Sequence, residues 1–138
     1  VRERDAVKEN EIGRIVVDCA VKLHKATGPG LLESVYEALL EQSLAERGLR
    51  VQRQVAVPLS FNGQQFIEAF RADLIVEDKV ILELKSVEKT SPAHHKQLQT
   101  YLKLSGKRLG FLLNFGAAIM KEGITRMVNN LPESSSAA

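Results

Sequence analysis

Three ionisable residues stand within one short stretch of alternating polar and apolar residues, RADLIVEDKVILELKS, residues 71–86. Asp73, Glu83 and Lys85 occur there among aliphatic residues that a core sheet would bury. Carboxylate oxygens are ligands that Mg²⁺ and Mn²⁺ prefer. A neighbouring ammonium can position a metal-bound water or offset charge on an attacked phosphate. These residue types therefore point to metal-assisted chemistry on a phosphate group.

The loop of this predicted hairpin decides which side chains share a face of the sheet. A three-residue loop at 77–79 places Val76 opposite Val80, whereas a two-residue loop would mix polar and apolar side chains on both faces. Burial favours the first register, in which Asp73 lies across from Glu83 with Cβ atoms about 4.5 to 5.5 Å apart. Lys85 then projects from the same face. The other face is wholly apolar and comprises Ala72, Leu74, Val76, Val80, Leu82 and Leu84.

Two carboxylates at that distance repel each other, and one would bind a proton unless a cation were shared between them. A divalent metal removes this conflict, and the backbone carbonyl of Leu84 would add a third oxygen ligand while leaving room for water and a phosphate. The alternative is a ladder of ion pairs on a solvated sheet face, because D-x₉-E-x-K is a loose pattern. The stretch by itself leaves both interpretations open.

Further polar residues occur at helical spacing elsewhere in the chain. Glu33 lies early in a predicted helix, where a carboxylate also stabilises the helix dipole. Gln97 and Tyr101 are four residues apart and so share one face of another predicted helix, where a solvated glutamine beside a core tyrosine is the alternative. Their occurrence together with the two acids and the lysine favours a functional role.

The elements that must position these residues are visible as periodic segments and turn signals. Asn62-Gly63 is a strong signal for a hairpin between two strands. Asn10 is the expected cap of the first helix, and TGPG ends that helix. The predicted elements are helices over residues 10–26, 31–47 and 91–106, strands over 51–61, 64–76, 80–85 and 109–115, and a weaker amphipathic segment up to Asn130, for which a helix is considered.

This order predicts an α/β fold with a mixed four-stranded sheet flanked by helices. The first three strands form an antiparallel meander, and the fourth is parallel to its neighbour because a helical crossover precedes it. Residues 1–131 are expected to form a single domain, and residues 132–138 a disordered tail.

Composition sets further bounds. Hydrophobic residues make up 44% and charged residues 26%, which excludes a disordered or collagenous chain. No apolar run is long enough to span a bilayer and the N-terminus has no apolar signal region, so a cytoplasmic location and no membrane partner are expected. Cys19 is the only cysteine, which excludes an intramolecular disulfide and a thiolate zinc site.

The net charge and the aromatic content do not identify a binding partner. A net charge of +2 permits nucleic acid without arguing for it. No run combines basic residues with exposed aromatics, and aromatic residues make up only 5%, so a base-stacking surface is not expected.

Taken together, the motifs resemble the GxxExxY protein family, a branch of the PD-(D/E)XK nuclease superfamily. The naming motif is GLLESVY, residues 30–36. The similarity extends from about Ile12 to Leu131, through HKATGPGLLESVYE, RADLIVEDKVILELKS, QLQTYLKLSG and GFLLNFG.

The resemblance implies a restriction-endonuclease-like core and assigns roles by position. Asp73 and Glu83 would bind the metal, with Glu33 completing its shell directly or through water, and Lys85 would be the catalytic lysine. Ala72 stands where the superfamily name has proline, which supplies no ligand. Gln97 and Tyr101 match the Q-x-x-x-Y helix of RecB-like nucleases, which positions the substrate near the metal.

The expected function is therefore a Mg²⁺- or Mn²⁺-dependent phosphodiesterase that acts on nucleic acid, with DNA as the expected substrate. A homodimer is expected because one such domain offers a single site and duplex cleavage needs two. The alternative is a nuclease-fold nucleic-acid-binding or regulatory module with little or no turnover. A third alternative is a structural protein with a solvated charge ladder.

Overall fold

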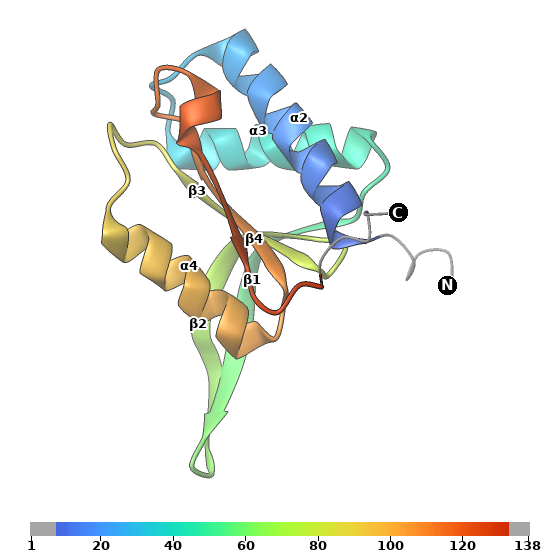
Figure 1. The fold of residues 1–138 in the computed structure, drawn as a ribbon, viewed down its shortest axis with the longest axis vertical. Helices are drawn as coiled ribbons and strands as arrows, with labels where there is room; N and C mark the ends of the chain where they lie inside the picture. Colours follow the sequence, from blue (N-terminus) through green and yellow to red (C-terminus); the bar gives the residue numbers. More distant parts are fainter. Residues whose placement is uncertain (1–7, 133–138) are drawn as a thin grey trace.

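The structure is a computed structural model, and it describes residues 8–132. These residues form a five-stranded sheet with helices on both sides (Figure 1). The elements in chain order are α2 (Glu9–Thr27), α3 (Glu33–Glu46), β1 (Val51–Phe61), β2 (Gln64–Val76), β3 (Val80–Lys85), α4 (Pro92–Ser105), β4 (Leu109–Asn114), the 3₁₀ helix η1 (Met120–Gly123) and β5 (Ile124–Val128).

The sheet has the strand order β1-β2-β3-β4-β5 and is mixed. β3 and β4 pair in parallel, as the helical crossover through α4 predicts, and the other neighbours pair antiparallel. The α/β class is confirmed, but the expected four strands are one too few. The segment considered as a helix forms η1 and β5 instead. β5 covers the open edge of the fully buried β4, whose backbone groups would otherwise lack partners.

Two apolar clusters hold the layers together, one on each face of the sheet. α2 and α3 pack on one face, and α4 packs on the other (Figure 1). The α4-side cluster contains Leu98 and Leu102 of the helix above Ile75, Ile81 and Leu112 of the sheet. The sheet is therefore buried on both sides where β2, β3 and β4 meet.

The predicted register of the β2–β3 hairpin is confirmed. Val76 pairs with Val80 and Leu74 with Leu82, and the turn between them places residues 77 and 78 in the left-handed region at φ 54° and 55°. On the α2 and α3 side, the cluster contains five of the six residues expected on the apolar face: Leu74, Val76, Val80, Leu82 and Leu84.

Ala72 is the exception, and its expected face was wrong. It packs in the α4-side cluster. The strand pair is irregular next to it, where Gln54 has a φ of 54° and falls between the pairs Arg53–Leu74 and Val55–Ala72. The face that the β1–β2 pair presents to α4 therefore changes at this level, which is also the level of Asp73.

The two ends of the described chain also differ in part from expectation. Lys8, not Asn10, is the N-cap of α2, and the side chain of Asn10 accepts a hydrogen bond from Arg126 of β5 at 2.7 Å. The predicted disordered tail falls almost entirely on residues 133–138, which lie outside the described residues. Within residues 8–132, no helix is long and apolar enough to cross a membrane.

Candidate active site

Asp73 and Glu83 meet where the β2–β3 ladder ends. Beyond the Leu74–Leu82 pair, the carboxylate of each acid bonds to the backbone of the opposite strand. Oδ2 of Asp73 accepts a hydrogen bond from the backbone N–H of Leu84 at 2.8 Å, and Oε2 of Glu83 accepts one from the N–H of Asp73 at 3.1 Å. Both carboxylates therefore reach into the gap between the two strands.

Burial and mutual repulsion disturb both groups. Burial, the negative charge of Asp73 and that of Glu37 raise the pKa of Glu83 to about 8, although the N–H of Asp73 and the charge of Lys85 oppose the shift. Burial also raises the pKa of Asp73, with smaller contributions from Glu37 and Glu33. The pair thus holds a proton more tightly than isolated carboxyl groups do, as expected where two acids share one site.

Lys85 supplies positive charge beside this pair. It is half-buried at the end of β3, and its charge acts on both carboxyl groups to lower their pKa against the effect of burial. An ammonium in that position can stabilise negative charge that develops next to the acids. The structure therefore brings the three residues of the 71–86 stretch together.

The GLLESVY motif places the start of α3 against this site. Tyr36 is fully buried and stacks on Phe115, with ring centroids 4.5 Å apart. Its hydroxyl donates to the carbonyl of Gly28 at 2.5 Å and accepts from the N–H of Leu31 at 3.2 Å. Gly30 has a φ of 109°, which a side chain rarely permits. Gly30 and Tyr36 therefore shape the loop that carries Glu33.

Glu33 lies in the first turn of α3, and its charge reaches Asp73, whose pKa it raises. Within the described residues, no three His, Cys, Asp or Glu side chains lie close enough together to hold one metal ion. Glu33 is thus a neighbour of the two acids and does not complete a three-carboxylate cluster with them. Whether Glu33 would bind a metal directly or through water stays a prediction.

Glu37, one helical turn after Glu33, is a site residue that the sequence reasoning missed. It is only 6% exposed. Its Oε1 accepts a hydrogen bond from Nε of Arg53 at 2.6 Å, and its Oε2 accepts one from the amide of Gln54 at 2.8 Å. The same amide lies 3.4 Å from Oδ1 of Asp73. The four-residue spacing from Glu33 was the available signal, but the partners come from β1.

We expect Glu37→Gln to lower the free energy of unfolding by about 1 to 3 kcal/mol, because buried hydrogen-bonding groups around it lose a charged partner. Urea denaturation measures this directly. Glu41→Gln is the matched control, since Glu41 lies one turn further along α3, 3.8 Å from Arg53, with a side chain 36% exposed. The control should change stability by less than about 0.5 kcal/mol. Equal effects from both substitutions would contradict a special role for Glu37.

The Gln97 and Tyr101 helix lies on the α4 side of the acids. Tyr101 stacks on Phe70, with centroids 3.8 Å apart and planes 3° from parallel. Phe70 stands three residues before Asp73 on β2, so the stack places Tyr101 beside the site. Burial raises the pKa of Tyr101, and the charges of Glu83 and Asp73 raise it further. Gln97 is exposed one turn earlier in α4. Tyr101 is brought to the site, and the role of Gln97 stays a prediction.

The donor set suits a hard divalent cation. The two backbone hydrogen bonds engage one oxygen of each carboxylate, Oδ2 of Asp73 and Oε2 of Glu83. Repulsion between the acids would be relieved by a shared cation, and the oxygen chemistry matches Mg²⁺ or Mn²⁺. Asp73 and Glu83 are therefore the residues that would hold the metal, and ligation by the Leu84 carbonyl stays a prediction.

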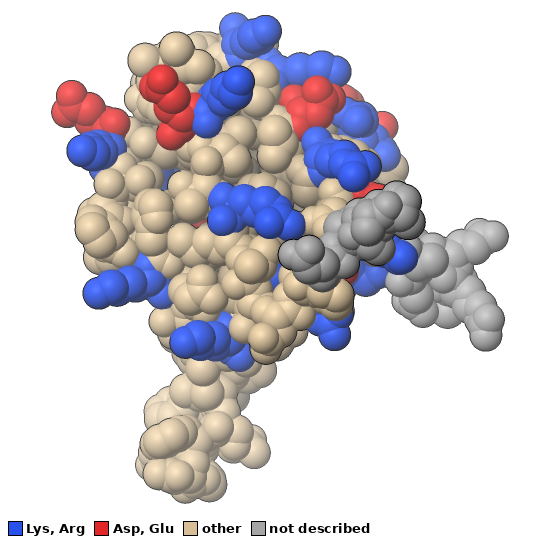
Figure 2. Space-filling model, viewed as in Figure 1, with Lys and Arg blue, Asp and Glu red and all other residues tan. Residues whose placement is uncertain are grey.

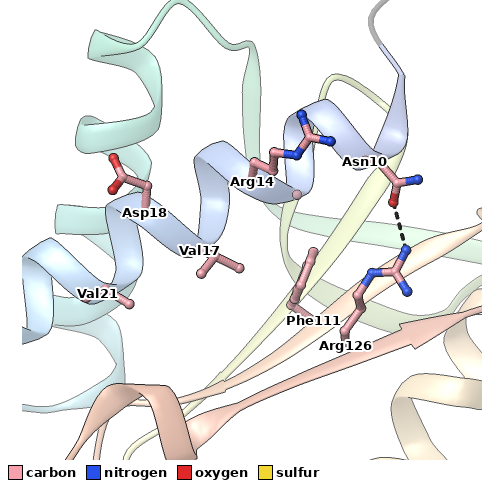
Figure 3. Close-up of a pocket in the computed structure, with 8 residues that line it drawn as sticks. Asn10, Arg14, Val17, Asp18, Val21, Phe111 and Arg126 are labelled. Carbon is pink, nitrogen blue, oxygen red and sulfur yellow. Dashed lines mark hydrogen bonds between the residues drawn. The ribbon is translucent and has the colours of Figure 1, made fainter. Parts of the chain in front are cut away.

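A separate open groove of about 660 Å³ lies between α2 and the β4–β5 edge (Figure 3). It is lined mainly by Gly13, Val17, Val21 and Phe111, with the Asn10–Arg126 hydrogen bond at one end. None of the predicted site residues lines it, and its walls offer no pair of carboxylates. This groove is therefore separate from the candidate site at the end of the β2–β3 ladder.

A family model described as the PD-(D/E)XK nuclease superfamily matches residues 10–127. Searches of curated proteins and of solved structures found no match. The matched region includes every residue discussed at this site.

Proposed function

The chain belongs to the PD-(D/E)XK nuclease superfamily, and from this premise we propose that it is a divalent-metal-dependent nuclease that hydrolyses phosphodiester bonds, with DNA as the substrate. The observation that carries the proposal is the crossed pair of hydrogen bonds by which Asp73 and Glu83 place both carboxylates between β2 and β3, within the electrostatic reach of Lys85. The GLLESVY motif supports assignment to the GxxExxY branch.

When bound, Mg²⁺ or Mn²⁺ would supply a Lewis acid for the phosphate and would favour deprotonation of the attacking water. Asp73 and Glu83 hold the charge that attracts the ion, and both must be deprotonated to do so. Lys85 stabilises the negative charge that builds up on the phosphate as the water oxygen attacks and the bond to the leaving oxygen breaks. Glu33 adds a carboxylate at longer range, suited to orienting water.

Other residues keep this arrangement in place. Glu37 holds Gln54 beside Asp73 and joins α3 to β1 through Arg53. Tyr101 closes the α4 side of the site through its stack on Phe70. Gln97, on the same helix face, is proposed to contact the substrate strand, which its exposure permits.

We expect Lys85→Met to lower the rate of cleavage at least about a hundredfold, because it removes the ammonium and keeps most of the apolar stem. The assay measures cleavage of single-stranded DNA, duplex DNA and RNA with Mg²⁺, with Mn²⁺ and with a chelator. The matched control is Lys22→Met on α2, an exposed lysine paired with Asp18 at 3.1 Å. The control should retain the parent rate.

The outcome also separates the proposal from its alternative. Metal binding measured by calorimetry, with no cleavage of any of the three substrates by the parent protein, would favour a binding or regulatory module. Cleavage that persists in the chelator would contradict a metal-dependent mechanism. A homodimer and a cytoplasmic location remain predictions, and sedimentation of the parent protein tests the first.

A further inference from the structure

The β1–β2 hairpin continues past the body of the protein as an arm, here defined as residues 58–69 (Figure 1). Every residue from 61 to 69 is exposed. Three of them are large apolar side chains: Phe61 is 63% exposed, Phe66 48% and Ile67 88%. Residues 54–67 contain no charged residue, and the arm shows neither basic nor acidic side chains on the face in Figure 2. Exposed apolar groups gathered on a projecting element are typical of a contact surface.

The aromatic residues of the arm share one face. Val57, Leu59 and Phe61 alternate along β1 and so point to the same side of the hairpin. Their paired residues in β2 lie on that side too, and these pairs are Val57–Phe70 and Leu59–Phe66. The shift of register between the two pairs is taken up by residues 67–69 of β2. Phe61, Phe66 and Phe70 therefore form one line along the arm.

This aromatic line ends at the active site. Phe70, at the root of the arm, is buried and stacks face to face with Tyr101 of α4. Phe70 stands three residues before Asp73 on the same strand, β2, so its stack with Tyr101 lies next to the site. A ligand that lies along this line from Phe61 to Tyr101 therefore extends toward the two acids.

The side of the molecule that borders this line is positively charged. Residues 89–108, which include α4, contain no Asp or Glu and carry five cationic residues: Lys89, Lys96, Lys103, Lys107 and Arg108. Of these, Lys107 is paired with Asp78 at 3.2 Å. Figure 2 shows Lys and Arg side chains over α4 and around the root of the arm, with no acidic side chain among them. Such a surface attracts phosphate groups.

We propose that the arm is a stacking surface for unpaired bases, and that the substrate is nucleic acid with a single-stranded segment leading to the cleavage site. This proposal deepens the proposed nuclease function and rests on it. Bases stack on Phe61 and Phe66, while the cations of the α4 side hold the phosphates. Stacking on aromatic rings beside a basic surface is the general mode by which proteins hold single strands.

The length of the arm sets the expected length of the single-stranded segment. Phe66 and Asp73 are seven residues apart along the bulged strand β2, but the same two levels are only five residues apart along β1, from Leu59 to Gln54. The distance is therefore about 17 to 23 Å at ~3.3 Å per residue. Stacked nucleotides rise ~3.4 Å each, so the segment between Phe66 and the acids is about five to seven nucleotides long. A single strand much shorter than this would not reach both places.

A second copy of the chain is a less suitable occupant of the arm. Two copies that paired arm against arm along the aromatic line would bring their cationic α4 sides toward each other, and like charges at an interface oppose association. A nucleic acid brings phosphates to the same cations and bases to the same rings. Charge therefore favours the nucleic acid.

The test is the affinity of a fluorescent 12-nucleotide single strand and of the corresponding duplex, measured by anisotropy in a chelator so that cleavage plays no part. Phe66→Ala should weaken binding of the single strand roughly tenfold and binding of the duplex less than about twofold. Phe66→Trp should keep the parent affinity, whereas Phe66→Leu, apolar but not aromatic, should not. Ile67→Ala, which removes an exposed apolar side chain off the line, is the matched control and should bind as the parent does.

Three results would overturn the proposal. The first is an unchanged single-strand affinity in Phe66→Ala, and the second is an equal loss for single strand and duplex. The third is a loss of self-association by Phe66→Ala in sedimentation, without any change in DNA binding. That result would show that the arm contacts a second copy of the chain. Because these affinities are measured without metal, they are independent of whether the parent protein cleaves.

Discussion

Asp73→Asn is expected to lower metal-dependent cleavage at least about a hundredfold while leaving the fold intact. Asparagine keeps one oxygen that can accept the hydrogen bond from the N–H of Leu84, so the join between β2 and β3 is preserved. It removes the charge that attracts a divalent cation. Metal binding measured by calorimetry should weaken in parallel with cleavage.

Asp73→Asn should also change the pKa of Glu83. The charge of Asp73 is one of the causes that raise the pKa of Glu83, so its removal should move that pKa back toward the ordinary value of 4.5. Asp78→Asn is the matched control, because Asp78 lies in the turn that follows the same strand and its side chain is 77% exposed. A folded Asp73→Asn protein that binds metal and cleaves as the parent does would remove the basis of the proposed function.

The metal-free protein is expected to lose stability as the pH rises from about 4.5 to about 8. The folded state raises the pKa of Glu83 from 4.5 to about 8, chiefly because the group is buried. Between these values, the folded protein keeps a proton that the unfolded chain has released. Stability therefore is greatest below the lower value and falls through the upper one. The raised pKa of Asp73 acts in the same direction.

The loss should amount to a few kcal/mol in the free energy of unfolding, at about 1.4 kcal/mol for each unit of pKa shift. Urea denaturation from pH 5 to pH 9 measures it. Glu83→Gln stays neutral at every pH and should flatten most of the slope, whereas Glu88→Gln, at an exposed loop position, should keep the parent slope. Added Mg²⁺ should restore stability above pH 8, because it binds the deprotonated pair. A parent slope that survives in Glu83→Gln would assign the pH dependence to other groups.

The register of the 71–86 hairpin could be predicted because its determinants are local. The alternation of residues and the length of the 77–79 turn admit only one pairing that buries a continuous apolar face, and this pairing places Asp73 and Glu83 together. Similar local signals predicted the Asn62-Gly63 turn and the parallel fourth strand. The convergence of the two acids and Lys85 could therefore be predicted from the sequence alone.

Other features depend on contacts between distant segments and had no local signal of comparable strength. The position of Glu37 depends on hydrogen bonds from Arg53 and Gln54 of β1. Residues 124–128 form a strand that pairs with the edge of β4.

The aromatic line was not expected from the sequence, since its members come from β1, β2 and α4 and form no continuous run. Only pairing across the hairpin and the packing of α4 bring Phe61, Phe66 and Phe70 into line with Tyr101. The amino-acid sequence by itself therefore determined the chemistry of this site, because neighbouring strands carry it. The tertiary structure alone decided what surrounds the site, because burial and long-range pairing are properties of the whole fold.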